Sequence, residues 1–212
     1  MMIVCCQRIL AACIAALFLL AAPIAAIAAM APQTMIGVAM IPHEGRDARW
    51  WRLFNALEFA PQLARMRACL ARPDACDAPA LRAWREDAAR AGGDPLRLAR
   101  AVSRRLGYVE DRTGHWLGPV DAYARGGDCE DHAVAKMASL LAVGVPETRL
   151  FVVVLRARDP RRRDHAVLAF AGPGGWRYLD MNDGGERSAA WIARRYRADI
   201  AYRADGRVFR AI

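Results

Sequence analysis

One cysteine of this chain lies in a sequence that suits a nucleophile. Cys129 stands in the middle of the segment Gly126-Gly127-Asp128-Cys129-Glu130-Asp131-His132-Ala133. A helical pattern starts here, so we expect Asp128 to cap a helix and Cys129 to lie in its first turn. The exposed backbone N–H groups and the helix dipole favour a thiolate at that position. The two glycines allow a sharp turn and a close approach of the backbone to a substrate.

A nucleophilic thiol needs a base, normally a histidine that a third polar group orients. His165 opens an expected strand, and Asp180 ends the next one. Adjacent antiparallel strands can bring such a pair together, which predicts the catalytic order Cys129, His165, Asp180. His132 is the alternative base, because it follows Cys129 by three residues on the same helix. For the two other histidines, His43 and His115, we expect a solvated surface position.

Three carboxylates flank the thiol, from Asp128, Glu130 and Asp131. Their negative charge should raise the pKa of Cys129, and a bound cation would remove this conflict. Calcium suits a set of oxygen ligands, so we expect a calcium site formed by these three residues. The alternative is purely structural: Asp128 caps the helix, Asp131 completes a capping box and Glu130 is solvated.

Acyl transfer also requires donors for the developing oxyanion. The backbone N–H of Cys129 is one natural donor. The indole N–H of Trp116, in the segment that leads to the nucleophile, is a candidate for the second. The competing interpretation of Trp116 is a buried packing residue.

The motif Gly127-Asp128-Cys129-Glu130-Asp131, then a helix, a strand headed by His165 and the segment Tyr178-Leu179-Asp180, resembles the bacterial transglutaminase-like cysteine proteinases. Val145-Pro146-Glu147 after the helix also fits. The similarity runs from about Trp84 to Ala211 and is greatest to LapG-type periplasmic proteases, which cut biofilm adhesins. One departure is His132, where the family usually carries an aromatic residue.

This resemblance implies a papain and transglutaminase type of fold, a Cys129, His165, Asp180 triad and calcium dependence. It also implies that the substrate is a large surface adhesin, cut at an alanine-rich site. An inner-membrane receptor for cyclic diguanylate is implied as a regulatory partner.

The N-terminus predicts export. Arg8 precedes an apolar run, Ile9 to Leu20, and an alanine-rich stretch with A-x-A patterns follows up to Ala31. We therefore expect a signal peptide over residues 1–29, its removal, and a periplasmic location. An uncleaved membrane anchor is the alternative, but the apolar run is shorter than the roughly 20 residues of a membrane span.

The cysteine count singles out Cys129 a second time. Three of the six cysteines lie in the expected signal peptide, which leaves Cys69, Cys76 and Cys129. An oxidising compartment favours a short-loop disulfide between Cys69 and Cys76. Cys129 then has no disulfide partner. An unpaired thiol is open to unwanted oxidation in an exported protein, so its presence indicates a function. A buried, inert cysteine is the alternative.

The remaining pattern predicts one α+β domain over residues 30–212. Residues 30–47 look extended, and helices are expected from Ala48, with a boundary at Pro61. A loop follows over 69–79, then helices over 80–91 and 96–106, a loop over 113–127 and the helix of Cys129. Short strands are expected over 150–155, 166–170 and 176–179, and a short helix and a strand pair over 191–212. The helices should pack on an antiparallel sheet.

The net charge of +9 is mostly arginine and is spread over the chain. Without the signature of a nucleic-acid-binding fold, we predict no nucleic-acid partner.

Three functions remain open on the sequence. The first is a calcium-dependent cysteine endopeptidase. The second is a transglutaminase or amide-transfer enzyme with the same triad, because the acyl-enzyme chemistry is shared. The third is a catalytically idle module that binds a peptide through the same groove.

Overall fold

The computed structural model describes residues 34–44, 47–55, 58–110, 113–181 and 185–212. The predicted signal peptide, residues 1–29, lies outside these ranges. Residues Pro32–Ile212 group into one compact unit. Among the helices that can be described, none is both long and apolar enough to cross a membrane.

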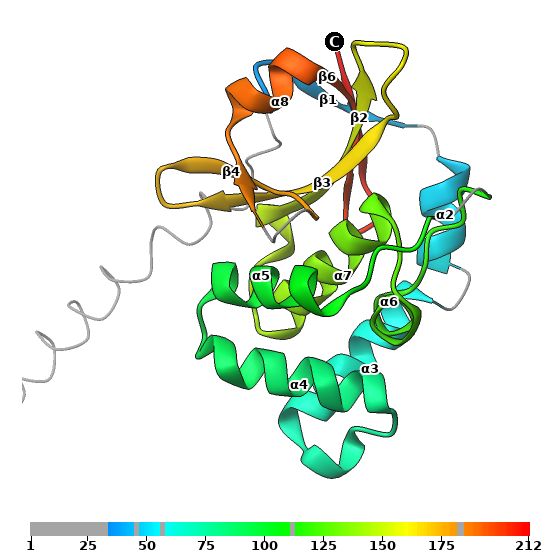
Figure 1. The fold of residues 1–212 in the computed structure, drawn as a ribbon, viewed down its shortest axis with the longest axis vertical. Helices are drawn as coiled ribbons and strands as arrows, with labels where there is room; N and C mark the ends of the chain where they lie inside the picture. Colours follow the sequence, from blue (N-terminus) through cyan, green and yellow to red (C-terminus); the bar gives the residue numbers. More distant parts are fainter. Residues whose placement is uncertain (1–33, 45–46, 56–57, 111–112, 182–184) are drawn as a thin grey trace, which may run out of the picture. The chain divides into compact units, whose positions relative to one another are not determined.

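Helices make up most of the first half of the described chain (Figure 1). Their bounds are α2 (Ala48–Asn55), α3 (Phe59–Ala71), α4 (Pro79–Ala91), α5 (Pro95–Arg105), α6 (Pro119–Arg125), α7 (Cys129–Ala142) and α8 (Ala189–Arg195), with short 3-10 turns at Pro73–Ala75 and Glu147–Arg149.

Local sequence explains where α4 and α5 begin and end. Gly92 ends α4 in the left-handed conformation, at φ 62°, which glycine adopts without strain. The Asp94 side chain then caps α5, accepting the N–H groups of Leu96 at 2.8 Å and Arg97 at 3.2 Å. Pro95 occupies the first helical position, where no N–H is needed. These boundaries confirm the expected ones.

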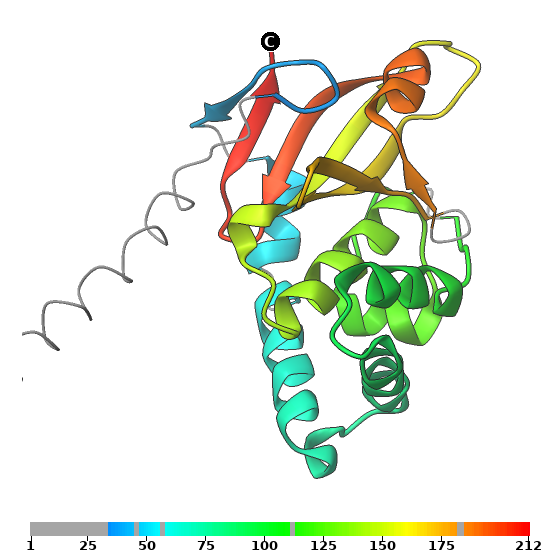
Figure 2. The same cartoon turned by 90° about the vertical axis from the view of Figure 1, so that its left-hand side faces the viewer.

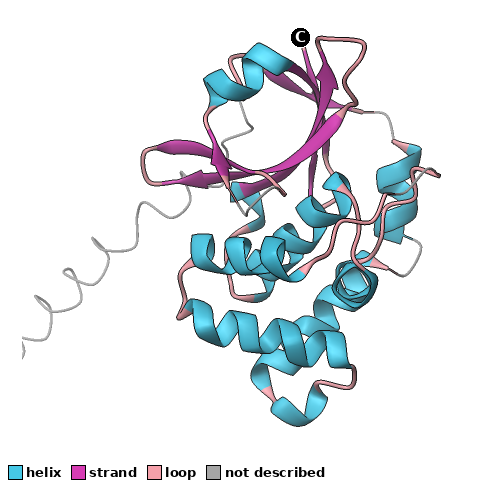
Figure 3. Ribbon diagram, viewed as in Figure 1, coloured by secondary structure: helices cyan, strands magenta, loops and turns pink. Residues whose placement is uncertain are grey.

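The second half contributes most of a seven-stranded antiparallel sheet (Figure 3). The strands are β1 (Met40–His43), β2 (Leu150–Ala157), β3 (His165–Gly172), β4 (Gly175–Leu179), β5 (Glu186–Arg187), β6 (Tyr196–Arg203) and β7 (Val208–Ala211), in the spatial order β1-β7-β6-β2-β3-β4-β5. In this register Leu155 pairs with His165 and Leu168 pairs with Leu179. The end of β4 is thereby brought close to the start of β3.

Helix α7 is the central element of the helical layer. It packs against β2 and β3 on one side and contacts α3, α5 and α6 on the other (Figure 2). Small and apolar side chains allow this close packing, and every residue from Asp131 to Leu141 is buried. The first turn of α7, which carries Cys129, is therefore held from both layers.

Three expectations about the elements were wrong. The predicted loop 113–127 contains α6, whose Pro119 stands at the first helical position and whose Val120 and Ala122 are buried. The predicted extended segment 30–47 contains β1, which pairs with β7. Helix α3 continues through Cys69 to Ala71, so the predicted loop 69–79 begins later than expected. Packing between residues far apart in the chain decides the bounds of these three elements, and the local hydrophobic pattern does not indicate such packing.

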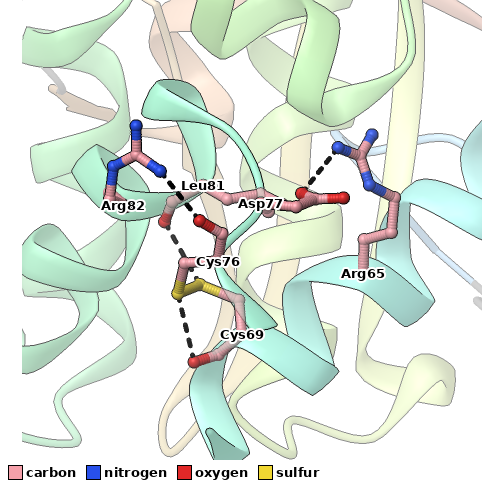
Figure 4. Close-up of a disulfide and its surroundings, with 6 residues drawn as sticks. All are labelled: Arg65, Cys69, Cys76, Asp77, Leu81 and Arg82. Atoms are coloured by element: carbon pink, nitrogen blue, oxygen red, sulfur yellow. Dashed lines mark hydrogen bonds and ion pairs between the residues drawn. A yellow bond between two sulfur atoms is a disulfide. The ribbon is translucent and has the colours of Figure 1, made fainter. Parts of the chain in front are cut away.

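The predicted disulfide is present. Cys69 and Cys76 are bonded, seven residues apart in the sequence, and join the last turns of α3 to the segment before α4 (Figure 4). Nearby, Arg65 forms an ion pair with Asp77 at 2.8 Å, and Arg82 donates to the carbonyl of Cys76 at 2.9 Å. In the part of the chain that is described, Cys129 is the free cysteine.

Candidate active site

The start of α7 is a capping box that fixes the position of Cys129. Asp128 is the N-cap, and its backbone N–H donates to the Asp131 carboxylate at 3.1 Å. The other Asp131 oxygen accepts the N–H of Leu117 at 2.7 Å. A Cβ at position 127 would lie 2.4 Å from the Asp131 side chain, so only glycine fits there. Asp131 thus ties the nucleophile's turn to the preceding segment.

The Cys129 thiol is held in its protonated form by its surroundings. Its Sγ donates to Oε2 of Glu130 at 3.1 Å. Burial is the largest cause that raises the pKa of this thiol, and the charges of Glu130 and Asp128 raise it further. The Ala166 N–H acts in the opposite direction. The sequence-based expectation of a suppressed thiolate therefore has a structural basis.

His165, at the start of β3, and Asp180, directly after the end of β4, form a direct pair. Nε2 of His165 lies 3.0 Å from Oδ1 of Asp180, and the carboxylate is fully buried. Burial alone would raise the pKa of Asp180, but the His165 ring, Arg187 and the Met181 N–H together hold it below its ordinary value. Asp180 is consequently a stable anion that orients the ring. This contact leaves Nδ1 as the ring nitrogen available for proton transfer with a thiol.

Two further charged residues hold Asp180, and the sequence analysis missed both. Nε of Arg187 donates to Oδ2 of Asp180 at 3.0 Å. Nζ of Lys136, on α7, donates to the Asp180 carbonyl at 2.7 Å. Lys136 is 1% exposed, and burial lowers its pKa to about 7.

A signal for Lys136 exists in the sequence. It is the only lysine among the 31 basic residues of the chain, and it interrupts an otherwise apolar stretch of helix. No comparable signal marks Arg187, because the chain is rich in arginine.

One cavity of about 480 Å³ brings the predicted catalytic residues together. Cys129, His165 and Asp180 line it, and so do Trp116, Asp128 and Glu130. The cavity therefore brings together the residues that the sequence predicted as nucleophile, base, orienting acid and oxyanion donor.

Trp116 fits both interpretations given above. Its ring packs edge-on against Trp50, at a centroid distance of 6.1 Å, and against Tyr202, at 5.4 Å. The side chain is 4% exposed, and its Nε1 is buried without a hydrogen-bond partner in the described structure. An indole donor on the same cavity as the thiol is thus held in place and has no hydrogen-bond partner among the described residues.

The alternative base, His132, occupies a different environment. Its side chain is 3% exposed and is not among the residues that line the catalytic cavity. Burial first, and the nearby Lys136 second, lower its pKa to about 4, so the ring is neutral at pH 7. His43 lies in β1 and His115 lies 3.8 Å from Glu58, and neither contributes to that lining.

The acidic residues around the thiol divide into two kinds. Ligand atoms of Asp128, Cys129 and Glu130 lie within 4.8 Å of one another. The carboxylates of Asp128 and Glu130 offer the hard oxygen atoms that calcium prefers. Asp131 is 1% exposed, and both of its oxygens accept backbone N–H groups. The geometry fits a cation beside Asp128 and Glu130, with Asp131 supporting the turn.

A family model described as the bacterial transglutaminase-like cysteine proteinase BTLCP matches residues 61–197, which is more than half of the chain. The chain belongs to this family of cysteine peptidases. Family membership, together with the cavity, makes the protein an enzyme.

Solved structures with the same fold include Legionella pneumophila LapG. One is 22% identical with a TM-score of 0.52, and the match covers 68% of this chain and 86% of that one. A calcium-bound LapG is 22% identical with a TM-score of 0.52, and the match covers 70% of this chain and 86% of that one. An EGTA-treated LapG is 21% identical with a TM-score of 0.51, and the match covers 66% of this chain and 81% of that one. The fold expectation is confirmed. No curated protein matches the chain.

Proposed function

We propose that this peptidase is a calcium-dependent endopeptidase in which Cys129, His165 and Asp180 form the catalytic triad. The observation that carries the proposal is the 3.0 Å contact between His165 and a fully buried Asp180, on the same cavity as a free thiol at a helix N-terminus. This arrangement has a nucleophile, a base and an orienting acid in the roles that acyl transfer requires.

Each group has one role in the reaction. Nδ1 of His165 accepts the proton of Cys129, and the thiolate attacks the carbonyl carbon of a peptide bond. The imidazolium then donates its proton to the leaving amine, which leaves a thioester on Cys129. His165 next takes a proton from water, whose oxygen attacks the thioester and releases the acid and the thiol. Asp180 remains ionised throughout and stabilises the imidazolium.

Two donors are suited to the oxyanion that forms in both steps. The backbone N–H of Cys129 lies at the start of α7, where helical N–H groups have no partner within the helix. The unused Nε1 of Trp116 is the second. Donors that are already fixed before reaction stabilise the oxyanion most effectively.

Calcium dependence is proposed from the charge conflict around the thiol. Burial raises the pKa of Cys129, and the charges of Glu130 and Asp128 raise it further, which opposes the formation of a thiolate. When bound, calcium supplies positive charge beside these carboxylates. The existence of LapG structures in calcium-bound and EGTA-treated forms supports this part of the proposal.

We further propose that the protein is exported to the periplasm by the signal peptide at residues 1–29. Its substrate would be a large surface adhesin cut at an alanine-rich site, with a role in biofilm attachment. An inner-membrane receptor for cyclic diguanylate would be its regulatory partner. The family resemblance described above supports these assignments.

The proposal can be tested on bacteria that encode this chain. A strain lacking the gene is complemented with the wild type or with Cys129→Ala, and the proteins released from the cell surface are identified by mass spectrometry. We expect a high-molecular-weight fragment with the wild type only. Release by Cys129→Ala that equals the wild type would rule out Cys129 as the nucleophile.

The purified mature chain tests calcium and the acceptor. Cleavage of the released protein should stop in EGTA and return with excess calcium, whereas full activity in EGTA would remove calcium from the proposal. A labelled primary amine in the same reaction should stay unincorporated. Its incorporation would favour amide transfer over hydrolysis.

A further inference from the structure

A second depression, of about 330 Å³, adjoins the catalytic cavity. It is lined by the β2–β3 loop residues Arg158, Asp159 and Arg162 and by Arg194 and Arg195 at the end of α8. Arg162 lines both hollows, so the depression continues the catalytic cavity at the end where this loop and α8 lie. We call its four arginines, Arg158, Arg162, Arg194 and Arg195, the arginine subsite.

The single carboxylate of the depression, from Asp159, offsets only part of the positive charge of the four arginines. Asp159 forms an ion pair with Arg161 at 3.1 Å, and Arg161 lies outside the depression with a side chain that is 89% exposed. Among the residues that the structure describes, Arg162 and Arg194 have no partner for a side-chain hydrogen bond or ion pair. Their guanidinium groups remain available to a ligand.

The other two arginines are held in place by neutral groups. Nε of Arg158 donates to the carbonyls of Ala193 at 2.8 Å and Tyr196 at 3.2 Å. Arg195 donates to the carbonyl of Trp191 at 3.4 Å, and its guanidinium lies over the Trp191 ring at 4.3 Å. These contacts orient both side chains and leave their charge uncompensated.

Two of the three other arginines along the catalytic cavity are already neutralised; the third is Arg49. Arg156 pairs with Asp164 and Asp199, and Arg163 pairs with Glu110. A substrate that lies in the cavity therefore meets surplus positive charge at the end formed by the arginine subsite. An extended peptide advances about 3.3 Å per residue, so a few residues beyond the scissile bond are enough to reach this end.

We propose that the arginine subsite binds acidic side chains of the substrate polypeptide on one side of the scissile bond. Guanidinium groups recognise carboxylates by paired N–H···O hydrogen bonds, and two of the four here have no competing partner. The inference rests on the proposed endopeptidase function and adds the substrate class: chains with Asp or Glu at one fixed side of the cut.

The test is cleavage of a peptide library derived from a digested proteome, analysed by mass spectrometry. The mature wild type with calcium is compared with Arg162→Gln/Arg194→Gln. The control is Arg100→Gln/Arg104→Gln on α5, which removes the same charge from exposed positions outside the subsite. We expect Asp and Glu to be enriched on one side of the cut, and kcat/KM for such peptides to fall about tenfold in the subsite variant only.

The outcomes separate the two levels of the proposal. Cleavage that depends on Cys129 but shows no acidic preference, or the same preference in both double variants, would overturn the subsite and leave the peptidase intact. If the wild type shows no cleavage beyond that of Cys129→Ala, the proposed function itself is overturned.

A binding measurement tests the subsite without catalysis. Fluorescein-labelled oligoglutamate is titrated with Cys129→Ala protein, with and without the two subsite substitutions, and anisotropy is recorded. The expected result is binding that weakens about tenfold in the subsite variant and weakens with added salt. Equal binding by the subsite and α5 variants, or no binding at all, refutes the assignment.

Discussion

Replacing Glu130 by glutamine in calcium-free protein tests whether a carboxylate suppresses the Cys129 thiolate. The thiol donates to Oε2 of Glu130 at 3.1 Å. Two unit charges at this separation interact by about 1.3 kcal/mol even with the dielectric constant of water, which equals about one pKa unit. The cavity is less polar than water, so this value is a lower bound. Glu130→Gln should lower the pKa of Cys129 by at least about one unit.

The assay is alkylation of the mature chain by iodoacetamide in EGTA between pH 7 and 9, followed by intact mass. At a pH below both pKa values, a drop of one unit gives about ten times more thiolate. The intrinsic nucleophilicity of the thiolate falls about threefold, so the net alkylation rate rises about threefold. Glu110→Gln is the matched control, because Glu110 lines the same cavity and is paired with Arg163.

If calcium binds as proposed, its addition should shrink the difference between wild type and Glu130→Gln, because a cation beside Glu130 would compensate the charge of this carboxylate. If Glu130→Gln is alkylated in EGTA no faster than the wild type, the electrostatic explanation of the raised pKa is wrong. A rate increase of similar size in Glu110→Gln would attribute the effect to the cavity as a whole.

Three further results are expected. Trp116→Phe keeps the ring packing but removes the indole donor, so kcat should fall by about 10²–10³ with little change in KM, and an unchanged kcat would exclude the oxyanion role. Lys136 is the only lysine, so protein labelled with ¹³C-lysine should give one side-chain signal that titrates near pH 7 because of burial. A buried amine with a lowered pKa binds fewer protons than in the unfolded chain. The free energy of unfolding of the wild type, measured relative to Lys136→Met, should therefore rise between pH 7 and 10 by up to about 1.4 kcal/mol per unit, whereas a flat difference contradicts this sign. Cys69→Ser/Cys76→Ser should lose about 2.5 kcal/mol of stability in urea with unchanged alkylation of Cys129, and loss of Cys129 reactivity would show that the bond supports the site itself.

The parts of the site that could be predicted are those with local causes. Two glycines, an N-cap and an apolar face identify the helix of Cys129, and turn residues on either side identify the strand of His165. The antiparallel register then accounts for the contact between His165 and Asp180, since β3 and β4 are neighbours in sequence and in space.

The parts that could not be predicted depend on residues far apart in the chain. Asp131 was expected as a calcium ligand, but its carboxylate accepts the N–H of Leu117, from a segment whose position only the fold determines. The pairing of β1 with β7 joins the two ends of the described chain. Arg187, on the neighbouring strand β5, donates to Asp180, and nothing in the sequence distinguishes it from other arginines.

Lys136 joins the two layers that share the catalytic centre. It lies on the same helix as Cys129, seven residues later, which corresponds to about 10 Å along the axis. Because Nζ of Lys136 donates to the Asp180 carbonyl, one helix sets the distance between Cys129 and Asp180, which directly follows β4. One residue inserted between positions 129 and 136 would rotate the lysine by about 100° and disconnect the layers. Changes of length after α7 would leave this spacing intact, so variation among related chains should concentrate there.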